Sequence, residues 1–271
     1  MKKLITFVIS LILLMSIGLC KNIGYSSLIQ SEEYPMFYIS IDKLTSIKVN
    51  KERYYDSDCF VARIITKDPH LLKTCFAHDD YRYVAPMSEV YEEHNAIFMV
   101  NADWSSIDFH ENYLIRNNIV IREGVHGGAY GAYFCILDDG HLAFMDLYSR
   151  VEDAIEAGVV HSFSFWSDNL LPNGEPKGDD YARHPRTFIG EVPRDDGYLE
   201  YIIIVADGRR PDSAGLTNYQ EALILKEKGC NIGYNLDGGG SSEMIFDGRI
   251  LNIPSDGQER YDHDFIYIEK P

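Results

Sequence analysis

The chain has 271 residues, a length that fits one or two domains. Apolar residues make up 45% and charged residues 25%, as in most soluble globular proteins. The formal net charge of −17 disfavours nucleic acid and anionic membrane surfaces as partners, because like charges repel at long range.

The first twenty residues are typical of a secretory signal peptide. Lys2 and Lys3 precede an apolar run over residues 4–19, and the small-residue pattern ending at Cys20 offers a cleavage site before Lys21. A membrane span is the alternative, but the run is slightly short for one and no second apolar stretch follows. The sequence therefore predicts export.

The sequence predicts three parts along the chain. We expect a signal peptide over residues 1–20, a polar linker over 21–35 and one folded domain over 36–271. The protein would be secreted or held at the cell surface, and lipidation of Cys20 is the second choice. A membrane is expected as a partner only through the signal peptide or such a lipid anchor.

Four cysteines remain once Cys20 is removed with the signal. No close pair suggests a zinc or redox motif. Outside the cell they could form disulfides in any of three pairings. Cys135 and Cys230 lie in apolar surroundings, so buried free thiols are the alternative.

After Pro35, short apolar runs alternate with a few helical stretches. This pattern favours an α+β fold, with a mixed, strand-rich sheet and a few packed helices. Helices are expected over Met87–His94, Val151–Ala157 and Asn218–Lys228. Strands are expected over Phe60–Thr66, Ala96–Asn101, Ile119–Arg122, Ala132–Leu137, Val159–Trp166, Thr187–Glu191, Tyr198–Ala206, Ile232–Leu236 and Phe265–Glu269.

Two local signals mark element boundaries. Thr217 and Gln220 form a capping box at the start of the third helix, and Gly229 follows its end. Asp247 and Gly248 predict a tight hairpin turn between two short apolar runs.

An apolar strand ends abruptly in the sequence Asp207-Gly208-Arg209-Arg210. A buried strand can hold a carboxylate and a guanidinium rigidly at its end, and Gly208 permits a tight turn there. Asp207 and Arg209 are therefore candidate catalytic residues. An ordinary solvated turn with a salt bridge is an equally good interpretation of this segment alone.

A second apolar strand is followed by Asp237, three glycines and two serines. Glycine runs cost conformational entropy and are useful where backbone approaches a ligand closely. The amides of Gly238–Gly240 could form an anion nest, to which Ser241 and Ser242 would add donors. We favour this over a flexible loop, and Asp237 becomes a second catalytic candidate. No lysine follows the glycines, so this is not a nucleotide-binding P-loop.

The segment Arg183–Thr187 opens another strand with two arginines around a proline. Arginine suits phosphate because its planar fork binds bidentately. Arg183, Arg186 and Thr187 are therefore candidate substrate-binding residues, with a basic surface turn as the alternative. His184 is a weaker acid–base candidate, because a structural histidine is more common.

At the end of the strand Ala96–Asn101, the side chains of Asn101 and Asp103 could bind sugar hydroxyls. Trp104 could stack on a sugar ring. An Asx turn with a packed tryptophan explains the segment equally well.

Taken together, these four segments resemble the phosphodiester glycosidase family. The segments Arg183–Gly190, Asp207–Arg209 and Asn235–Ser242 match its Arg-x-Pro-Arg-Thr-x-x-Gly, Asp-Gly-Arg and Asn-Leu-Asp-Gly-Gly-Gly-Ser elements in order and spacing. The resemblance covers roughly residues 90–271. Four positions depart from the pattern: Ala102 replaces a glycine, Trp104 and Ser105 stand where aromatics such as Phe are usual, and Glu243 stands where a small residue is common.

This resemblance implies a single catalytic domain that hydrolyses the glycosidic bond of a sugar-1-phosphodiester, such as an N-acetylglucosamine-1-phosphodiester. The products would be a free sugar and a phosphomonoester. Asp207 and Asp237 would be the two carboxylates, and Arg186 and Arg209 would hold the phosphate. The expected partner is a phosphorylated glycan or sugar phosphodiester. No cofactor is predicted, because no ligands stand at a recognisable metal spacing, although a divalent cation near the aspartates would suit the chemistry.

Two other functions fit the same residues. A non-catalytic surface module that binds a phosphorylated glycan would keep the arginines and the glycine loop without needing both aspartates. A phosphodiesterase would cut the P–O bond instead and release a sugar 1-phosphate.

Overall fold

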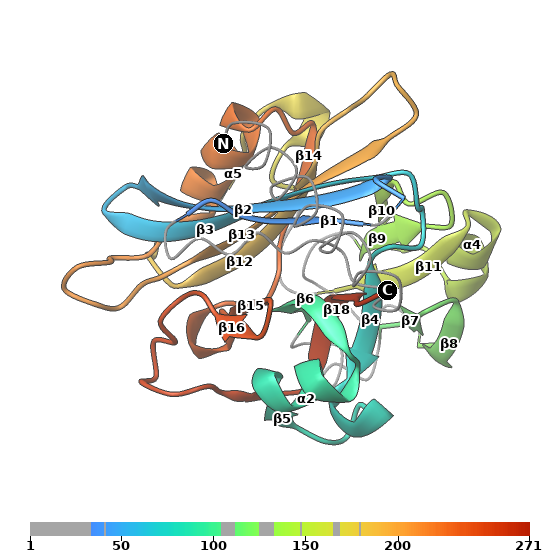
Figure 1. Ribbon diagram of the computed structural model, residues 1–271. Coiled ribbons are helices and arrows are strands. Elements are labelled where there is room, and N and C mark those ends of the chain that lie inside the picture. Colours follow the sequence, from blue (N-terminus) through green and yellow to red (C-terminus); the bar gives the residue numbers. More distant parts are fainter. Residues whose placement is uncertain are drawn as a thin grey trace, which may run out of the picture.

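The computed structural model describes the chain from residue 34 onward, apart from a few short segments (Figure 1). The described residues are 34–40, 42–103, 112–124, 133–146, 148–164, 169–178 and 180–271. The expected signal peptide, nearly all of the linker and Trp104 lie outside them. Among the described residues, no helix is long and apolar enough to cross a membrane.

One layer of the fold is a six-stranded antiparallel sheet with the order β1-β2-β3-β13-β12-β14. Every residue of β13 is buried, because the sheet is covered on both faces. The strands are β1 (Met36–Ile39), β2 (Thr45–Tyr54), β3 (Ser57–Thr66), β12 (Arg186–Glu191), β13 (Leu199–Ala206) and β14 (Ile232–Asn235).

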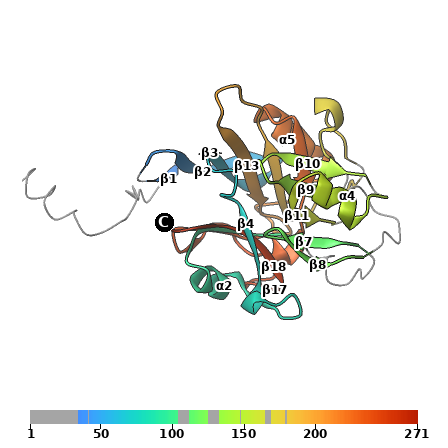
Figure 2. The same cartoon turned by 90° about the vertical axis from the view of Figure 1, so that its right-hand side faces the viewer.

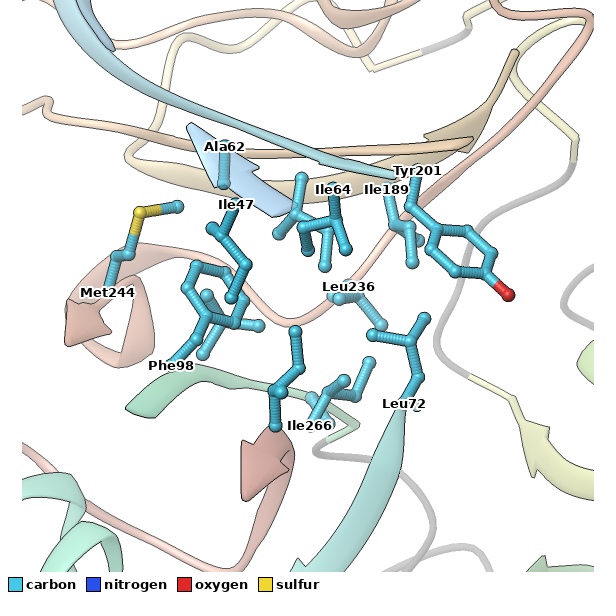
Figure 3. Packing of buried hydrophobic residues seen from close by; sticks show 14 of the residues in the cluster. Ile47, Ala62, Ile64, Leu72, Phe98, Ile189, Tyr201, Leu236, Met244 and Ile266 are labelled. Carbon is cyan, nitrogen blue, oxygen red and sulfur yellow. The ribbon is translucent and has the colours of Figure 1, made fainter. Parts of the chain in front are cut away.

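A five-stranded antiparallel sheet, β16-β15-β6-β18-β4, forms the second layer. Figure 3 shows Ile64 and Ile189 of the first sheet in one apolar cluster with Phe98 and Ile266 of the second, and Leu236 lies among them. This cluster is the main core. The strands are β4 (Lys73–Phe76), β6 (Ala96–Asn101), β15 (Met244–Phe246), β16 (Arg249–Ile250) and β18 (Asp264–Glu269).

The helices cover the outer faces of the two layers. Helix α5 (Asn218–Glu227) packs on the six-stranded sheet, and α2 (Met87–Glu93) packs below the five-stranded one (Figure 1). Further elements gather at the side away from β1, as Figure 2 shows. These are β7 (Leu114–Arg116), β8 (Ile119–Arg122), β9 (Tyr133–Leu137), β10 (Leu142–Met145), α4 (Val151–Glu156) and β11 (Val159–Phe163). The remaining short elements are η1 (Ala77–Asp79), β5 (Ala85–Pro86), η2 (Pro172–Gly174), η3 (Gly239–Ser241) and β17 (Tyr261–Asp262).

Local sequence signals predicted the helices and one turn well. All three expected helices are present, and the capping box is confirmed: the Gln220 amide donates to Thr217 Oγ1 at 3.2 Å, and the Thr217 amide donates to the Gln220 side chain at 3.0 Å. Asp247 and Gly248 have φ of +52° and +71°, so the expected tight turn between β15 and β16 is confirmed.

The strand-rich α+β fold is confirmed, with a correction to the sheet. A mixed sheet was expected, but every strand pair among the described residues is antiparallel, in more than one sheet. Short turns join β1 to β2, β2 to β3, β7 to β8, β9 to β10 and β15 to β16, and such connections produce antiparallel pairs. Strand β2 was not predicted, although buried and half-buried residues alternate over its first half.

The four cysteines of the domain are all buried and free. The alternative of buried thiols therefore holds for the whole set, and none of the three disulfide pairings is present.

A buried ion pair joins the side elements to the second sheet. Arg116 of β7 donates to the Asp264 carboxylate, with Nε 3.2 Å from Oδ1, and both side chains are at most 2% exposed. The guanidinium also lies 4.5 Å from the centre of the Phe163 ring. This pair fixes Asp264, which lines the pocket described below.

Replacing Arg116 with Met should lower the free energy of unfolding by about 3–5 kcal/mol, because the Asp264 charge would stay buried without its partner. Urea unfolding followed by circular dichroism measures the change. Arg150→Met is the matched control, since Arg150 is an exposed arginine paired with Glu152. A decrease for Arg116→Met no larger than for the control would contradict this role.

Candidate active site

The strand order brings three of the sequence motifs to one end of the six-stranded sheet. Strand β12 pairs antiparallel with β13 on one side and with β14 on the other. The ends of β13 and β14 therefore meet the beginning of β12. Asp207 directly follows β13, Arg186 begins β12, and Asp237 lies two residues beyond β14. Their proximity depends on this long-range pairing, which no local signal in the sequence specifies.

The side chain of Asn101 connects this sheet end to the other layer. Its Oδ1 accepts the Thr187 hydroxyl at 2.6 Å and the Glu243 amide at 3.2 Å, and its Nδ2 donates to the Asp237 carbonyl at 2.7 Å. Asn101 is only 1% exposed. Asn101 and Thr187 were expected to bind substrate, but here both side chains bind protein groups and hold the turn that carries Asp237.

A small pocket opens beside this junction, between the end of β6, the turn after β14 and the β17–β18 segment. Four of its seven lining residues are aspartates, so it concentrates negative charge. Asn101, Asp103 and Asp237 were predicted from the sequence, whereas Asp262, His263 and Asp264 were not. The lining residues are Asn101, Ala102, Asp103, Asp237, Asp262, His263 and Asp264.

Asp237 is the pocket residue best placed for proton transfer. Its surroundings strip water from the carboxyl and raise its pKa to about 7, a shift that Ser241 opposes by hydrogen bonding and that the nearby Asp262 carboxylate increases. Ser241 Oγ also donates to Asp262 Oδ1 at 3.0 Å. The Ser241 hydroxyl thus lies beside two half-buried carboxyls, of which Asp237 can both give and accept a proton near neutral pH.

The glycine turn carries the chain from β14 of one sheet to β15 of the other. The Gly238 amide donates to Asp237 Oδ1 at 2.7 Å, and the Gly239 amide donates to the Pro185 carbonyl at 2.9 Å. Two of the three amides expected to form an anion nest therefore already bind protein groups. Gly239 has φ of +66°, a conformation that side chains rarely adopt.

Arg209 is an exposed cation beside this turn. Its Nη2 lies 3.1 Å from where a Cβ on residue 239 would be, and 3.4 Å from His184 Nδ1. Burial and the charges of Arg186 and Arg209 lower the pKa of His184, so the imidazole is neutral near pH 7. No carboxylate among the described residues forms a salt bridge with Arg209, which leaves it available to an anion. Arg183 is also exposed and donates to the Gly215 carbonyl at 2.8 Å.

Arg186 points the other way, toward α5. It shares a face of β12 with Phe188, and its Nη2 donates to Asp180 Oδ2 at 2.6 Å while its Nε donates to the Leu216 carbonyl at 3.1 Å. Glu221 of α5 is fully buried 3.1 Å from Nε, and burial raises its pKa while Arg186 opposes the shift. Much of the Arg186 guanidinium is thus engaged inside the protein, where it helps to hold α5 and the loop before β12.

Asp207 is buried and does not line the pocket that holds Asp237. Its Oδ1 accepts the Ile253 amide at 2.9 Å, and its Oδ2 lies 3.2 Å from Arg210 Nη1. Burial raises its pKa, against the hydrogen bond from Ile253 and the charge of Arg210. These contacts hold the segment after β16 against the end of β13.

Behind the turn lies Glu243, one of the residues that depart from the family pattern. It is 3% exposed, its Oε1 has no hydrogen-bond partner among the described residues, and burial together with the Glu259 carboxyl raises its pKa to about 9. Glu259 in turn accepts the amide and hydroxyl of Ser88 at the start of α2, both at 2.8 Å. The hydroxyl of Ser242 is buried without a partner in the described part of the chain. Glu243 is therefore a neutral acid packed behind the pocket.

One group of described side chains has the spacing of metal ligands. His78, Glu89 and Glu93 bring one ligand atom each within 4.8 Å of one another, on η1 and α2. All three are exposed, and none lines the pocket with Asp237.

The sequence profile of phosphodiester glycosidases matches residues 94–269, a range that contains every pocket residue. The chain belongs to the phosphodiester glycosidase family. A curated relative is the SPbeta prophage-derived uncharacterised protein YomE of Bacillus subtilis strain 168, which is 30% identical over 228 residues. That match covers 74% of this chain and 34% of the relative, so the chain spans about a third of the length of that protein.

Solved structures show the same fold. The catalytic domain of zebrafish N-acetylglucosamine-1-phosphodiester alpha-N-acetylglucosaminidase superposes with a TM-score of 0.66 at 18% identity, over 91% of this chain and 87% of that one. A hypothetical protein from Synechocystis gives a TM-score of 0.64 at 12% identity, over 92% and 69% of the two chains. At these identities the likeness establishes the fold.

Glu243→Gln should stabilise the protein at high pH and change little at low pH. Above the ordinary glutamate pKa of 4.5 the unfolded chain releases its proton, but the folded protein keeps it until about pH 9. Stability therefore falls as pH rises through this window, and glutamine removes that cost. We expect the variant to melt several degrees higher than wild type at pH 8.5, since about 1 kcal/mol shifts Tm by about 2–4 °C at this size.

Differential scanning calorimetry at pH 4 and pH 8.5 measures this difference. Glu152→Gln, which changes an exposed glutamate, is the control. The same Tm difference at both pH values would show that Glu243 titrates normally.

Proposed function

We propose that this protein hydrolyses the bond between the anomeric carbon of a sugar and the oxygen of a phosphodiester, releasing free sugar and a phosphomonoester. The observation that carries the proposal is the Asp237–Ser241–Asp262 arrangement, in which a carboxyl with a pKa near 7 adjoins a second carboxyl and a glycine turn lined by Arg209. Membership of the phosphodiester glycosidase family supports it.

The chemistry follows from the nature of the leaving group. A phosphate leaves more readily than an alcohol, so it needs positive charge around it more than full protonation. Arg209 supplies such charge in a protein that is otherwise strongly acidic. Water adds to the anomeric carbon as the C–O bond breaks, and Asp237 or Asp262 accepts the proton that this water releases. An overall negative field makes local arginines necessary for binding an anionic substrate.

Product analysis in water enriched in heavy oxygen separates this reaction from the two alternatives. Cleavage at the anomeric carbon places the label in the free sugar. A phosphodiesterase would place it in the sugar 1-phosphate, and a binding module would release neither product. A panel of sugar-1-phosphodiesters, including an N-acetylglucosamine-1-phosphodiester, would also identify the preferred sugar.

Asp237→Asn should lower turnover at least about 10²-fold, because asparagine cannot exchange a proton. In wild type, Asp237 should give the pH–rate profile a limb near pH 7, which is absent from the variant. Asp196→Asn is the control, since Asp196 lies in the exposed turn between β12 and β13, at the other end of these strands. Near wild-type turnover in a folded Asp237→Asn protein would eliminate Asp237 as a catalytic group.

The second carboxylate can be identified by the same assay. We expect Asp262→Asn to lower turnover as well. The double variant Asp237→Asn/Asp262→Asn should lose less turnover than the two single losses multiplied, because groups that act on one transition state fail together. Asp207→Asn should mainly lower stability, since Asp207 holds Ile253 and Arg210. If Asp207→Asn instead stays fully stable and turnover falls, the catalytic pair is Asp207 and Asp237, as the sequence pattern suggested.

Export is part of the proposal and rests on the sequence of the first twenty residues. N-terminal sequencing of the protein from the culture medium or cell surface should begin near Lys21. A mature protein that retains Met1 would indicate an uncleaved anchor, and a lipid on Cys20 would indicate a lipoprotein.

A further inference from the structure

Two guanidinium groups cover neighbouring glycines of the turn after β14. Arg209 packs on Gly239, with Nη2 3.1 Å from the position of a Cβ there. At Gly240 the approach is closer: Nη2 of Arg260 and Oδ2 of Asp256 each lie 2.1 Å from where a Cβ would be. Any side chain at position 240 would displace this ion pair, so the glycine makes room for an arginine and a carboxylate on the backbone.

The ion pair on Gly240 is compact and open to solvent. Asp256 Oδ2 accepts Arg260 Nη2 at 2.7 Å and Nε at 3.2 Å, and both side chains are 40% exposed. Hydrogen bonding to Arg260 lowers the pKa of Asp256, and the charge of Arg209 adds to this effect. One carboxylate therefore interacts with both arginines that cover the turn.

The pair also adjoins the catalytic carboxyls. Arg260 Nη1 lies 3.4 Å from the Ser241 hydroxyl, which itself donates to Asp262 at 3.0 Å. The amide of Gly240 beneath the pair has no acceptor among the described residues, unlike the amides of Gly238 and Gly239. Arg209, Arg260 and an amide without an acceptor thus lie beside the acidic pocket, with the Ser241 hydroxyl between Arg260 and Asp262. An anionic leaving group would lie against these donors.

We propose that Arg260 and Arg209, with the Gly240 amide, bind the phosphate of the substrate, and that the Asp256 carboxylate occupies this place when no substrate is bound. The inference rests on the proposed function and deepens it. It assigns to Arg260 the second phosphate contact that the sequence pattern assigned to Arg186. Arg186 is unsuited to it, because its guanidinium is 7% exposed and paired with Asp180 and Glu221.

Asp256 can move aside because its segment is held lightly. It lies in an exposed turn in which the Gly257 amide donates to the Pro254 carbonyl at 3.0 Å. A phosphate offers more acceptor oxygens and more charge than a carboxylate, so it can displace Asp256 while Arg260 stays in place. The substrate would then compete with an internal anion, which weakens binding of every phosphate compound.

Isothermal titration calorimetry with inorganic phosphate and with a sugar-1-phosphodiester tests the inference at fixed ionic strength. Arg260→Gln should weaken phosphate binding about 10-fold or more, because it removes one charge-assisted hydrogen bond. Asp256→Asn should tighten binding about 10-fold, because it removes the competing carboxylate. Arg260→Lys should restore part of the affinity. Asp80 and Arg82 form another aspartate–arginine ion pair at the surface, so Asp80→Asn and Arg82→Gln are the matched controls.

Unchanged phosphate affinity in a folded Arg260→Gln protein overturns the inference, as does weaker binding in Asp256→Asn. Its failure is distinguishable from that of the proposed function. If Arg260→Gln hydrolyses a sugar phosphodiester with the same KM as wild type, the proposed function stands and the phosphate site is wrong. Phosphate binding that depends on Arg260, in a protein that hydrolyses none of the phosphodiesters, supports the site and overturns the function.

Discussion

The arrangement of the site depends on the buried amide of Asn101. This side chain leaves β6 of one sheet and binds the Thr187 hydroxyl of the other, the carbonyl of Asp237 and the amide of Glu243. An amide can serve as donor and acceptor at once, which the neighbouring groups require because water cannot reach them. These hydrogen bonds therefore fix the two layers relative to each other at the point where the chain crosses between them. They also fix the glycine turn, which makes that crossing.

The glycine turn separates a group of carboxyls from a group of arginines. On one side, Asp237 and Asp262 line a pocket where desolvation favours the protonated form of a carboxyl and raises the pKa of both. On the other side, arginines pack directly on glycine backbone, which brings positive charge closer to the carboxyls than any side chain at those positions would allow. A protein with a net charge of −17 can attract an anion only at such a local concentration of cations.

The sequence revealed the parts of the site that have local signatures. The run of glycines identified the turn, and the capping box placed α5, because both depend on neighbouring residues. The direction in which a side chain points was harder to predict from the sequence. Arg186 lies on the same face of β12 as Phe188, so it points under α5 and away from the turn. Asp262, His263 and Arg260 have no such signature. Only the pairing of β17 with β5 and of β18 with β6 brings Asp262 and His263 into the pocket and Arg260 beside the glycine turn. Contacts of this kind depend on the complete fold.

The central pairing of β3 with β13 joins residues 59–66 to residues 199–206. The six-stranded sheet therefore cannot form completely until most of the chain has been synthesised. The contact between Ser88 and Glu259 likewise joins residues 171 positions apart. Such distant pairings make folding slow, because a long loop must be ordered before its contacts form. No partly folded state that lacks the last third of the chain can hold a complete pocket. Ligand binding should consequently appear only with the final, cooperative step of folding, and a ligand would stabilise the whole domain rather than one loop.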